Sequence, residues 1–296
     1  MSSAGSQPPR RPAAGGTPRD DTAGLLAEVA EDAATGDIAR VYGELRSVAG
    51  YDLVPLFYRV LAGDPAALYW AWHVLQPAFR RGVVAATARA AELPDGRRYA
   101  TLPAPGWELL GLSATDLAEA RLVVSGFNSA NPFNLVVVLL LEQALRDGTM
   151  IDAADAPFVA EDRPGIAHRP PLALAGLPPA QISMIEWLST RGGSEPFVAA
   201  PTLWRCLAHW PPLLAMAAAQ LEPLHASGAT EAAVKAIRRS VAVDLAARSE
   251  AAGRRSVAAP EPAEADHVLR VTSFFGAKVP EMIFTGHLLQ VLLAEA

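Results

Sequence analysis

The stretch PTLWRCLAHWPPLL (residues 201–214) repeats the pattern of an earlier stretch, PLFYRVLAGDPAAL (residues 55–68). At an offset of 146 residues (201 − 55), both copies share Pro, Arg, Leu, Ala, Pro and Leu at matching positions. Each copy has the composition of an apolar helix with a central arginine, followed by a proline that begins the next helix. This agreement predicts that the chain contains the same helical unit twice.

A second pair of similar segments supports this prediction. FNSANPFN (residues 127–134) corresponds to FGAKVPEM (residues 275–282) at an offset of 148 (275 − 127). In both, a phenylalanine is followed five residues later by a proline and then by an apolar run. Two copies are too few for a solenoid, so we expect a tandem duplication whose halves are related by a pseudo-twofold axis.

Hydrophobic periodicity predicts an all-α fold. Ile38, Val41, Tyr42 and Leu45 fall at i, i+3, i+4 and i+7, which places them on one face of a helix. Similar stripes occur in residues 117–124, 182–188 and 232–246. The sequence shows no clear alternation of the kind that strands produce.

Composition divides the chain into four segments. Residues 1–22 are rich in Pro, Gly, Ser and Arg and are expected to be a disordered tail. Residues 149–180 carry six prolines and are expected to form a long crossing linker. The first helical repeat should then span residues 23–148, and the second residues 181–296.

Charge and cysteine content exclude several functions. A net charge of −6 without a Lys/Arg run argues against nucleic acid, which requires a concentrated basic face. The single cysteine, Cys206, excludes an internal disulfide and a thiolate zinc cage, and its apolar surroundings suggest an inert core position. The longest apolar run, residues 135–141, is too short for a membrane span. We therefore expect a cytoplasmic protein that does not act on membranes.

Asn131-Pro132 has the pattern of a helix start, with Asn as the cap and Pro in the first turn. The free amides of such a turn favour an anion such as a carboxylate. Asn128 and Asn134 add amide groups on nearby turns. The alternative is an ordinary capped helix whose asparagines serve the loop. The second copy, Val279-Pro280, lacks the Asn cap, so an anion site should be present in one half only.

Other polar residues have a functional and a structural interpretation. Arg59 and Arg205 could grip a carboxylate, but their duplication favours a shared structural role, such as bonding a loop carbonyl in both halves. His209 could be a general base or a helix-end residue. Lys278, expected on a loop beside Phe274 and Phe275, could be desolvated and reactive or simply solvated. The histidines have no metal-ligand spacing, so no metal is expected.

Three segments carry a resemblance to a known family. They are DIARVYGELRSVAGYDLVPLFYRVLAGDPAAL (residues 37–68), VVSGFNSANPFNLVVVLLLEQAL (residues 123–145) and TLWRCLAHWPPLL (residues 202–214). In this order and at these separations they resemble the group I 2-haloacid dehalogenases. The first unit also looks like those of alkylhydroperoxidase and carboxymuconolactone decarboxylase proteins, but the catalytic cysteines of those proteins are missing here.

The resemblance implies an all-α pseudo-dimer of two repeats in one chain, commonly assembled as a homodimer. The family's enzymes displace halide from either enantiomer of a short 2-haloacid with an aspartate-activated water and need no cofactor. Their site lies between the repeats, with aromatic residues from the first repeat around the substrate. The Asn of the "NP" step in the family corresponds to Asn131.

This sequence departs from the family pattern at several site positions. The family's catalytic carboxylate lies in a Ser-Asp-aromatic step, and here that step reads Thr202-Leu203-Trp204. Thr202 can replace the serine hydroxyl, but Leu203 cannot deprotonate water. The expected Trp and Phe of the first repeat fall near Leu53 and Leu56, and Asn134 stands where the family has a Tyr. These differences suggest a changed substrate.

Three hypotheses follow. The first is a dehalogenase-like enzyme refitted for another small organic acid or acyl compound, with secondary metabolism as a possible setting. The second is a true 2-haloacid dehalogenase whose base has moved to Glu195, His209 or Glu281. The third is a binding or scaffold protein that has kept the duplicated fold and lost catalysis.

Overall fold

The apolar stripes of the sequence become a set of helices, here described in a computed structural model. It describes residues 27–51, 53–95, 101–152, 169–193, 195 and 197–294. The predicted disordered tail, residues 1–22, lies outside the described residues, as does half of the predicted linker, residues 153–168.

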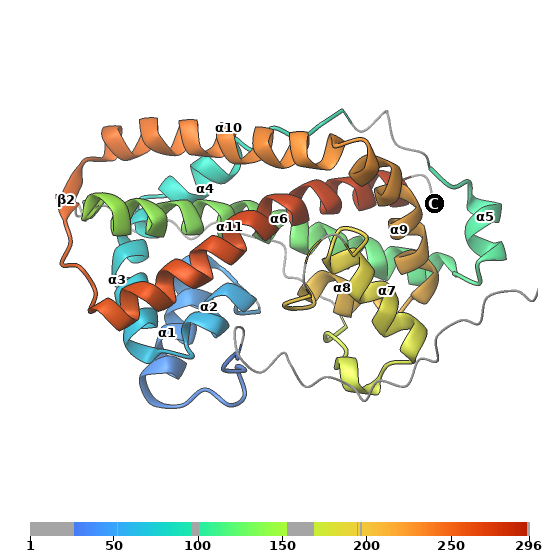
Figure 1. The fold of residues 1–296 in the computed structure, drawn as a ribbon, viewed down its shortest axis with the longest axis horizontal. Coiled ribbons are helices and arrows are strands. Elements are labelled where there is room, and N and C mark those ends of the chain that lie inside the picture. Colours follow the sequence, from blue (N-terminus) through green and yellow to red (C-terminus); the bar gives the residue numbers. More distant parts are fainter. Residues whose placement is uncertain are drawn as a thin grey trace, which may run out of the picture.

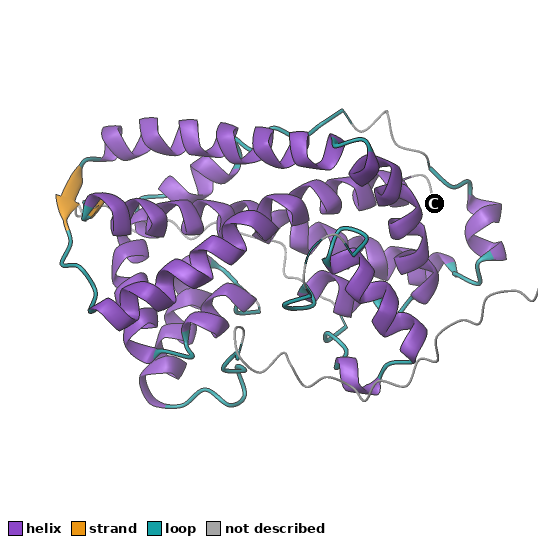
Figure 2. Ribbon diagram, viewed as in Figure 1, coloured by secondary structure: helices purple, strands orange, loops and turns teal. Residues whose placement is uncertain are grey.

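The described chain is mostly helical, which confirms the predicted fold class (Figure 2). Its elements are α1 (Gly36–Ala49), α2 (Leu56–Leu61), α3 (Pro65–Arg80), α4 (Val83–Ala88), α5 (Ala104–Leu109), α6 (Ala114–Asp147), β1 (Thr149–Ile151), the 3-10 turn η3 (Leu174–Gly176), α7 (Pro179–Ser189), α8 (Thr202–Leu207), α9 (Pro211–Ala226), α10 (Ala229–Ala252), β2 (Arg254–Ser256) and α11 (Pro262–Ala294).

One small sheet was not predicted. β1 and β2 pair antiparallel, with Thr149 opposite Ser256 and Ile151 opposite Arg254. β1 lies inside the segment expected to be linker, and α7 begins within it as well. Three-residue strands are too short to produce a recognisable alternation in the sequence.

Two long helices form the centre of the molecule. α6 and α11 make the most extensive interhelical contact, and they cross near the middle of the view in Figure 1. Helices α1–α3 lie at one end of this pair and α7–α9 at the other, while α10 runs along it. Helix α6 is long and apolar enough to cross a membrane by composition, but its apolar run, residues 135–141, is buried among other helices. It is therefore a core helix.

Several elements recur at the offsets of the repeated segments. The bounds of α2 and α8 differ by the offset of the first pair, and so do those of α3 and α9. The latter two helices each contain a proline in the last turn, Pro77 and Pro223. The first residues of α6 and α11 differ by the offset of the second pair, and Pro132 and Pro280 inside these helices correspond in the same way.

The predicted helix start at Asn131-Pro132 is wrong. α6 begins seventeen residues earlier (131 − 114), where the Ser113 side chain accepts a hydrogen bond from the Asp116 amide and the Asp116 carboxylate accepts one from the Ser113 amide. This capping box pairs the Ser113 and Asp116 amides, two of the donors that a helix start leaves free. Asn131 is therefore an interior residue and caps nothing.

The same correction applies to the second half. Pro280 lies inside α11, so Lys278 is a helix residue and does not lie on a loop. A proline inside a helix leaves the carbonyl four residues earlier without its usual amide partner. For Pro280 this is the carbonyl of Gly276, which accepts a hydrogen bond of 3.1 Å from Arg238 Nη1. The helix continues through the proline because its flanking turns are buried.

The two long helices approach closely at two glycines. A Cβ on Gly286 of α11 would overlap Asn128 Oδ1 of α6. A Cβ on Gly276 of α11 would lie 3.4 Å from the Val138 side chain of α6. Asn128 donates to the Gly286 carbonyl at 3.0 Å, which ties the helices together at the first point.

Candidate functional site

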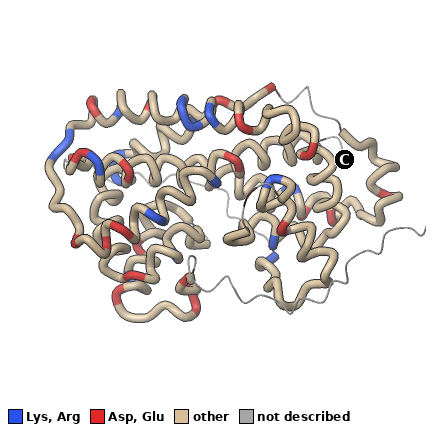
Figure 3. The backbone as a smooth tube through the Cα atoms, viewed as in Figure 1, with Lys and Arg blue, Asp and Glu red and all other residues tan. Residues whose placement is uncertain are grey.

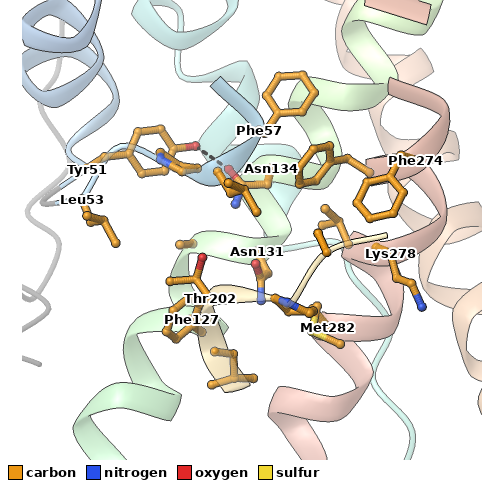
Figure 4. A pocket seen from close by; sticks show the side chains of 18 residues that line it. Tyr51, Leu53, Phe57, Phe127, Asn131, Asn134, Thr202, Phe274, Lys278 and Met282 are labelled. Carbon is orange, nitrogen blue, oxygen red and sulfur yellow. Dashed lines mark hydrogen bonds between the residues drawn. The ribbon is translucent and has the colours of Figure 1, made fainter. Parts of the chain in front are cut away.

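A cavity of about 100 Å³ lies between α2, α6, α8 and α11 (Figure 4). Its walls come from the two central helices, from the first turns of α2 and α8, and from the segments before those turns. The lining residues are Tyr51, Leu53, Pro55, Leu56, Phe57, Phe127, Ala130, Asn131, Asn134, Ala199, Pro201, Thr202, Leu203, Phe274, Phe275, Lys278, Val279 and Met282. This is smaller than the roughly 300–1,000 Å³ of drug-sized ligand pockets, so the cavity suits a ligand of only a few heavy atoms.

The polar groups of the lining come mainly from α6 and α8, which pack against each other. Asn131 and Thr202 are each 8% exposed. The Oδ1 atom of Asn134 accepts a hydrogen bond of 3.2 Å from the Tyr51 hydroxyl, drawn as a dashed line in Figure 4. The Asn131 Nδ2 atom is buried and has no hydrogen-bond partner among the described residues. A buried donor of this kind is costly unless a ligand or water satisfies it.

The rest of the lining is apolar, with aromatic rings prominent. The rings of Phe57 and Phe275 meet edge to face, with 5.4 Å between their centroids. Phe274 packs against Phe275 in the same manner, at 5.2 Å. Leu203 is 1% exposed and joins this wall. An apolar body and a few fixed polar groups are typical of small-molecule pockets.

Lys278 lines the cavity with its aliphatic stem only. Figure 4 shows its ammonium turned away from Asn131 and Thr202. Nζ donates to the Ser189 carbonyl at 2.9 Å, to Glu195 at 2.7 Å and to Glu281 at 3.2 Å. These bonds use all three donors of the ammonium group.

Arg191 completes a group of four charges, hereafter the Lys278 cluster (Arg191, Glu195, Lys278 and Glu281). Its Nε donates to Glu281 at 2.8 Å, and its Nη1 lies 3.2 Å from Glu195. Burial raises the pKa of Glu195, but the Lys278 hydrogen bond and the nearby positive charges outweigh this effect and lower it below its ordinary value. Glu281 is 1% exposed, and these partners offset the cost of burying its carboxylate.

The candidate bases do not gather at the cavity. Glu195 and Glu281 belong to the Lys278 cluster and are not lining residues. His209 lies at the end of α8, where its Nε2 is 3.0 Å from the Pro170 carbonyl. The described lining contains no carboxylate and no imidazole. Asp52, between Tyr51 and Leu53 in the sequence, lies outside the described residues.

The remaining predicted site residues divide into two groups. Leu53, Leu56, Asn131, Asn134, Thr202 and Leu203 all line the cavity. Asn128 does not, because its amide is bonded to Gly286 and Gln290 at the helix crossing.

The two duplicated arginines have structural partners, but these differ. Arg205 Nε donates to the Leu172 carbonyl at 2.9 Å, as expected for a loop carbonyl. Arg59 Nη1 lies 3.0 Å from a carboxylate oxygen of Glu28. The expectation of a loop carbonyl for the side chain therefore fails in the first half, although the Arg59 backbone carbonyl accepts from the Val29 amide.

Metal and thiol chemistry find little support in the described residues. They contain no group of three or more His, Cys, Asp or Glu side chains placed to hold a metal ion. Cys206 is fully buried, and burial raises the pKa of its thiol to about 11. The thiol is therefore protonated at neutral pH.

The arrangement matches known structures, although no family model and no curated protein matches the sequence. A D-2-haloacid dehalogenase mutant has a TM-score of 0.67 and 16% identity, over 91% of this chain and 96% of that one. A mutant complex with D-2-CPA gives a TM-score of 0.66, 18% identity and coverages of 90% and 96%. A complex with L-LA gives 0.67, 17% identity and coverages of 90% and 97%.

The chain has the fold of the 2-haloacid dehalogenases. This confirms the coarse part of the resemblance seen in the sequence. Because the identities are 16–18%, the comparison establishes the fold and leaves the activity to be argued from the site.

Much of the aromatic wall was not predicted from the sequence. Phe127 and Phe275 stand at matching positions of the second repeated pair, and both line the cavity. The repeated segments therefore held a usable signal, because these two phenylalanines recur at one offset and both line the cavity. Nothing in the sequence pattern marked Tyr51.

Proposed function

We propose that this protein is a small-molecule enzyme with a dehalogenase-like fold, acting on a small organic acid or acyl compound. The carrying observation is the cavity between the helices, where the partnerless Asn131 Nδ2 atom lies in a mainly aromatic and aliphatic lining. A ligand with one polar head and an apolar body would satisfy both features. The dehalogenase fold supports an enzyme of the hydrolase type.

The cavity is proposed to lie on the pseudo-twofold axis of a duplicated chain. The helix crossing supports this, because Asn128 meets Gly286 and Gly276 meets Val138. Adding 148 to 128 and 138 gives 276 and 286, so each contact is the symmetry mate of the other. Reciprocal pairs of this kind characterise an isologous, two-fold interface. The lining repeats in the same way, because it contains both first prolines of the first repeated pair, Pro55 and Pro201.

Ordinary hydrolytic dehalogenation is not the proposed reaction. Leu203 stands where the resemblance puts the water-activating aspartate, and the described lining offers no other base. Positioned general-base assistance contributes about 10²- to 10⁴-fold to a rate, so its loss would leave little turnover. A relocated base at Glu195, His209 or Glu281 is disfavoured because none of the three lines the cavity.

The second candidate is a catalytically silent binding protein. The observation that favours it is again the lack of a carboxylate or imidazole in the described lining. Such a protein would bind small acyl compounds and leave them unchanged.

A two-step experiment separates the candidates. Purified protein is first screened for binding of small acids, amides and esters by thermal shift and calorimetry, and bound compounds are then incubated and analysed for products. Binding with turnover supports the enzyme, and binding without turnover supports the silent protein. Failure of every compound to bind overturns the proposed pocket. Halide release from either enantiomer of 2-chloropropionate would contradict the assignment of Leu203.

A further inference from the structure

The polar groups of the cavity break the symmetry of the repeat. Each stands at a position whose counterpart in the other half is apolar: Asn131 and Val279, Asn134 and Met282, Thr202 and Leu56, Lys278 and Ala130, Tyr51 and Phe197. Three of the five, all except Lys278 and Tyr51, come from α6 and α8. The cavity therefore has a polar side formed by these helices and an apolar side formed by α2 and α11.

The polar side carries no available positive charge. Lys278 is the only cationic residue in the described lining, and its ammonium is bonded to Glu195, Glu281 and a backbone carbonyl. Helix α6 does not begin at Asn131, so its N-terminus does not act at the cavity, and α2 and α8, whose first turns line it, are only six residues long each and have weak macrodipoles. The side-chain groups that remain are two neutral amides and the hydroxyls of Thr202 and Tyr51.

We propose that the cavity selects a neutral carbonyl head, such as an amide, an ester or a protonated acid, and excludes the carboxylate anion. The Asn131 amide donates to the carbonyl oxygen, which supplies the partner that Nδ2 lacks. The apolar body of the ligand lies against Phe57 and Phe275. This inference rests on the proposed function and narrows its substrate class.

Electrostatics support this choice. Moving a carboxylate from water into a small apolar cavity is strongly unfavourable unless a cation or several donors compensate it. The partnerless Asn131 donor suffices for a carbonyl oxygen, which needs only one or two hydrogen bonds. The same cavity is therefore suited to the uncharged ligand and poorly suited to the charged one.

The test compares ligands of one shape and different charge. Isovaleramide, methyl isovalerate and isovalerate are titrated into the intact protein by calorimetry at pH 7.5. We expect the amide or the ester to bind at least tenfold more tightly than the anion. Isovalerate affinity should fall about tenfold for each pH unit above the pKa of the acid, while amide affinity stays constant.

Matched variants locate the head group. Asn131→Ala should weaken amide binding about tenfold, whereas Asn128→Ala, on the same helix but outside the cavity, should leave it unchanged. If Asn131→Ala does not fold, the pH dependence of isovalerate binding to the unmodified protein still tests the inference. The inference would be overturned if isovalerate bound more tightly than the amide, if this binding did not depend on pH, and if it were lost in Lys278→Met. The proposed pocket would then remain intact. Absence of binding by all three ligands would overturn both.

Discussion

Leu203 and Thr202 occupy adjacent lining positions on the first turn of α8, facing the cavity from the second half of the chain. If Leu203 replaces a catalytic aspartate, Leu203→Asp should raise halide release from 2-chloropropionate at least tenfold above the unmodified protein. Leu203→Asn is the control, since it is polar and similar in size but cannot act as a base. If a folded Leu203→Asp variant releases no halide, Leu203 does not stand at the position of the catalytic aspartate.

Cys206 is a residue for which the sequence and the structure agree. Its burial and the raised pKa of its thiol, about 11, predict that a thiol reagent labels the native protein very slowly at pH 8. Labelling should become rapid in denaturant. Fast labelling of the native protein would mean that α8 opens readily, because the thiol is otherwise inaccessible.

For single residues, the sequence predicted which side chains line the cavity better than it predicted which side chain could act as a base. Thr202, Leu203 and Asn131 could be identified because each lies a fixed distance from a recognisable motif. His209 could not be placed, because its position depends on the segment near Pro170. Contacts between segments distant in sequence leave no local pattern.

Among the elements, the crossing of α6 and α11 is the most sensitive to substitution. A methyl group on Gly286 would displace the Asn128 amide and break its bonds to the Gly286 carbonyl and to Gln290. Gly286→Ala should therefore lower the free energy of unfolding by about 1–3 kcal/mol.

A double-mutant cycle tests the cause. In an Asn128→Ala background, Gly286→Ala should cost less, because the clashing amide is already gone. Equal costs in both backgrounds, measured by urea denaturation, would show that the Gly286 effect does not pass through Asn128.

Helix boundaries show why the prediction of α6 failed. Pro132 has the sequence signature of a first turn, and the Ser113 capping box was the stronger signal. Proline inside a helix costs about 3 kcal/mol, which burial of a long apolar run can outweigh. The helical periodicity was read correctly, and the error lay in giving one proline more weight than its surroundings.

For the molecule as a whole, the Lys278 cluster ties α11 to the turn after α7. Charges of both signs are otherwise spread along the chain (Figure 3). Glu281→Gln should lower the free energy of unfolding by about 3–5 kcal/mol, because it leaves Lys278 and Arg191 without their shared buried partner. Glu231→Gln, which breaks an exposed pair with Lys235, is the control and should change it by less than about 1 kcal/mol. Similar losses in both variants would contradict a special role for the cluster.

The pH dependence of stability should reveal a half-buried group, His225 on α9. Burial lowers the pKa of His225 below its ordinary value of 6.5, and its Nδ1 lies 2.9 Å from the Thr230 hydroxyl. Below pH 6.5 the unfolded chain binds a proton that the folded protein resists. The His225 contribution is therefore fully present above pH 6.5 and is lost as the pH falls through the folded pKa.

The measurement is urea denaturation between pH 8 and pH 5.5. This range lies above the ordinary pKa of Glu195, whose lowered pKa makes its own contribution disappear only in more acidic solution. The unfolding free energy of the unmodified protein should fall toward pH 5.5, and His225→Gln should flatten that slope. His73→Gln, at an exposed position on α3, should keep it. If the unfolding free energy of His225→Gln depends on pH as steeply as that of the unmodified protein, another group takes up the proton. Removal of the responsible histidine would have to change this dependence.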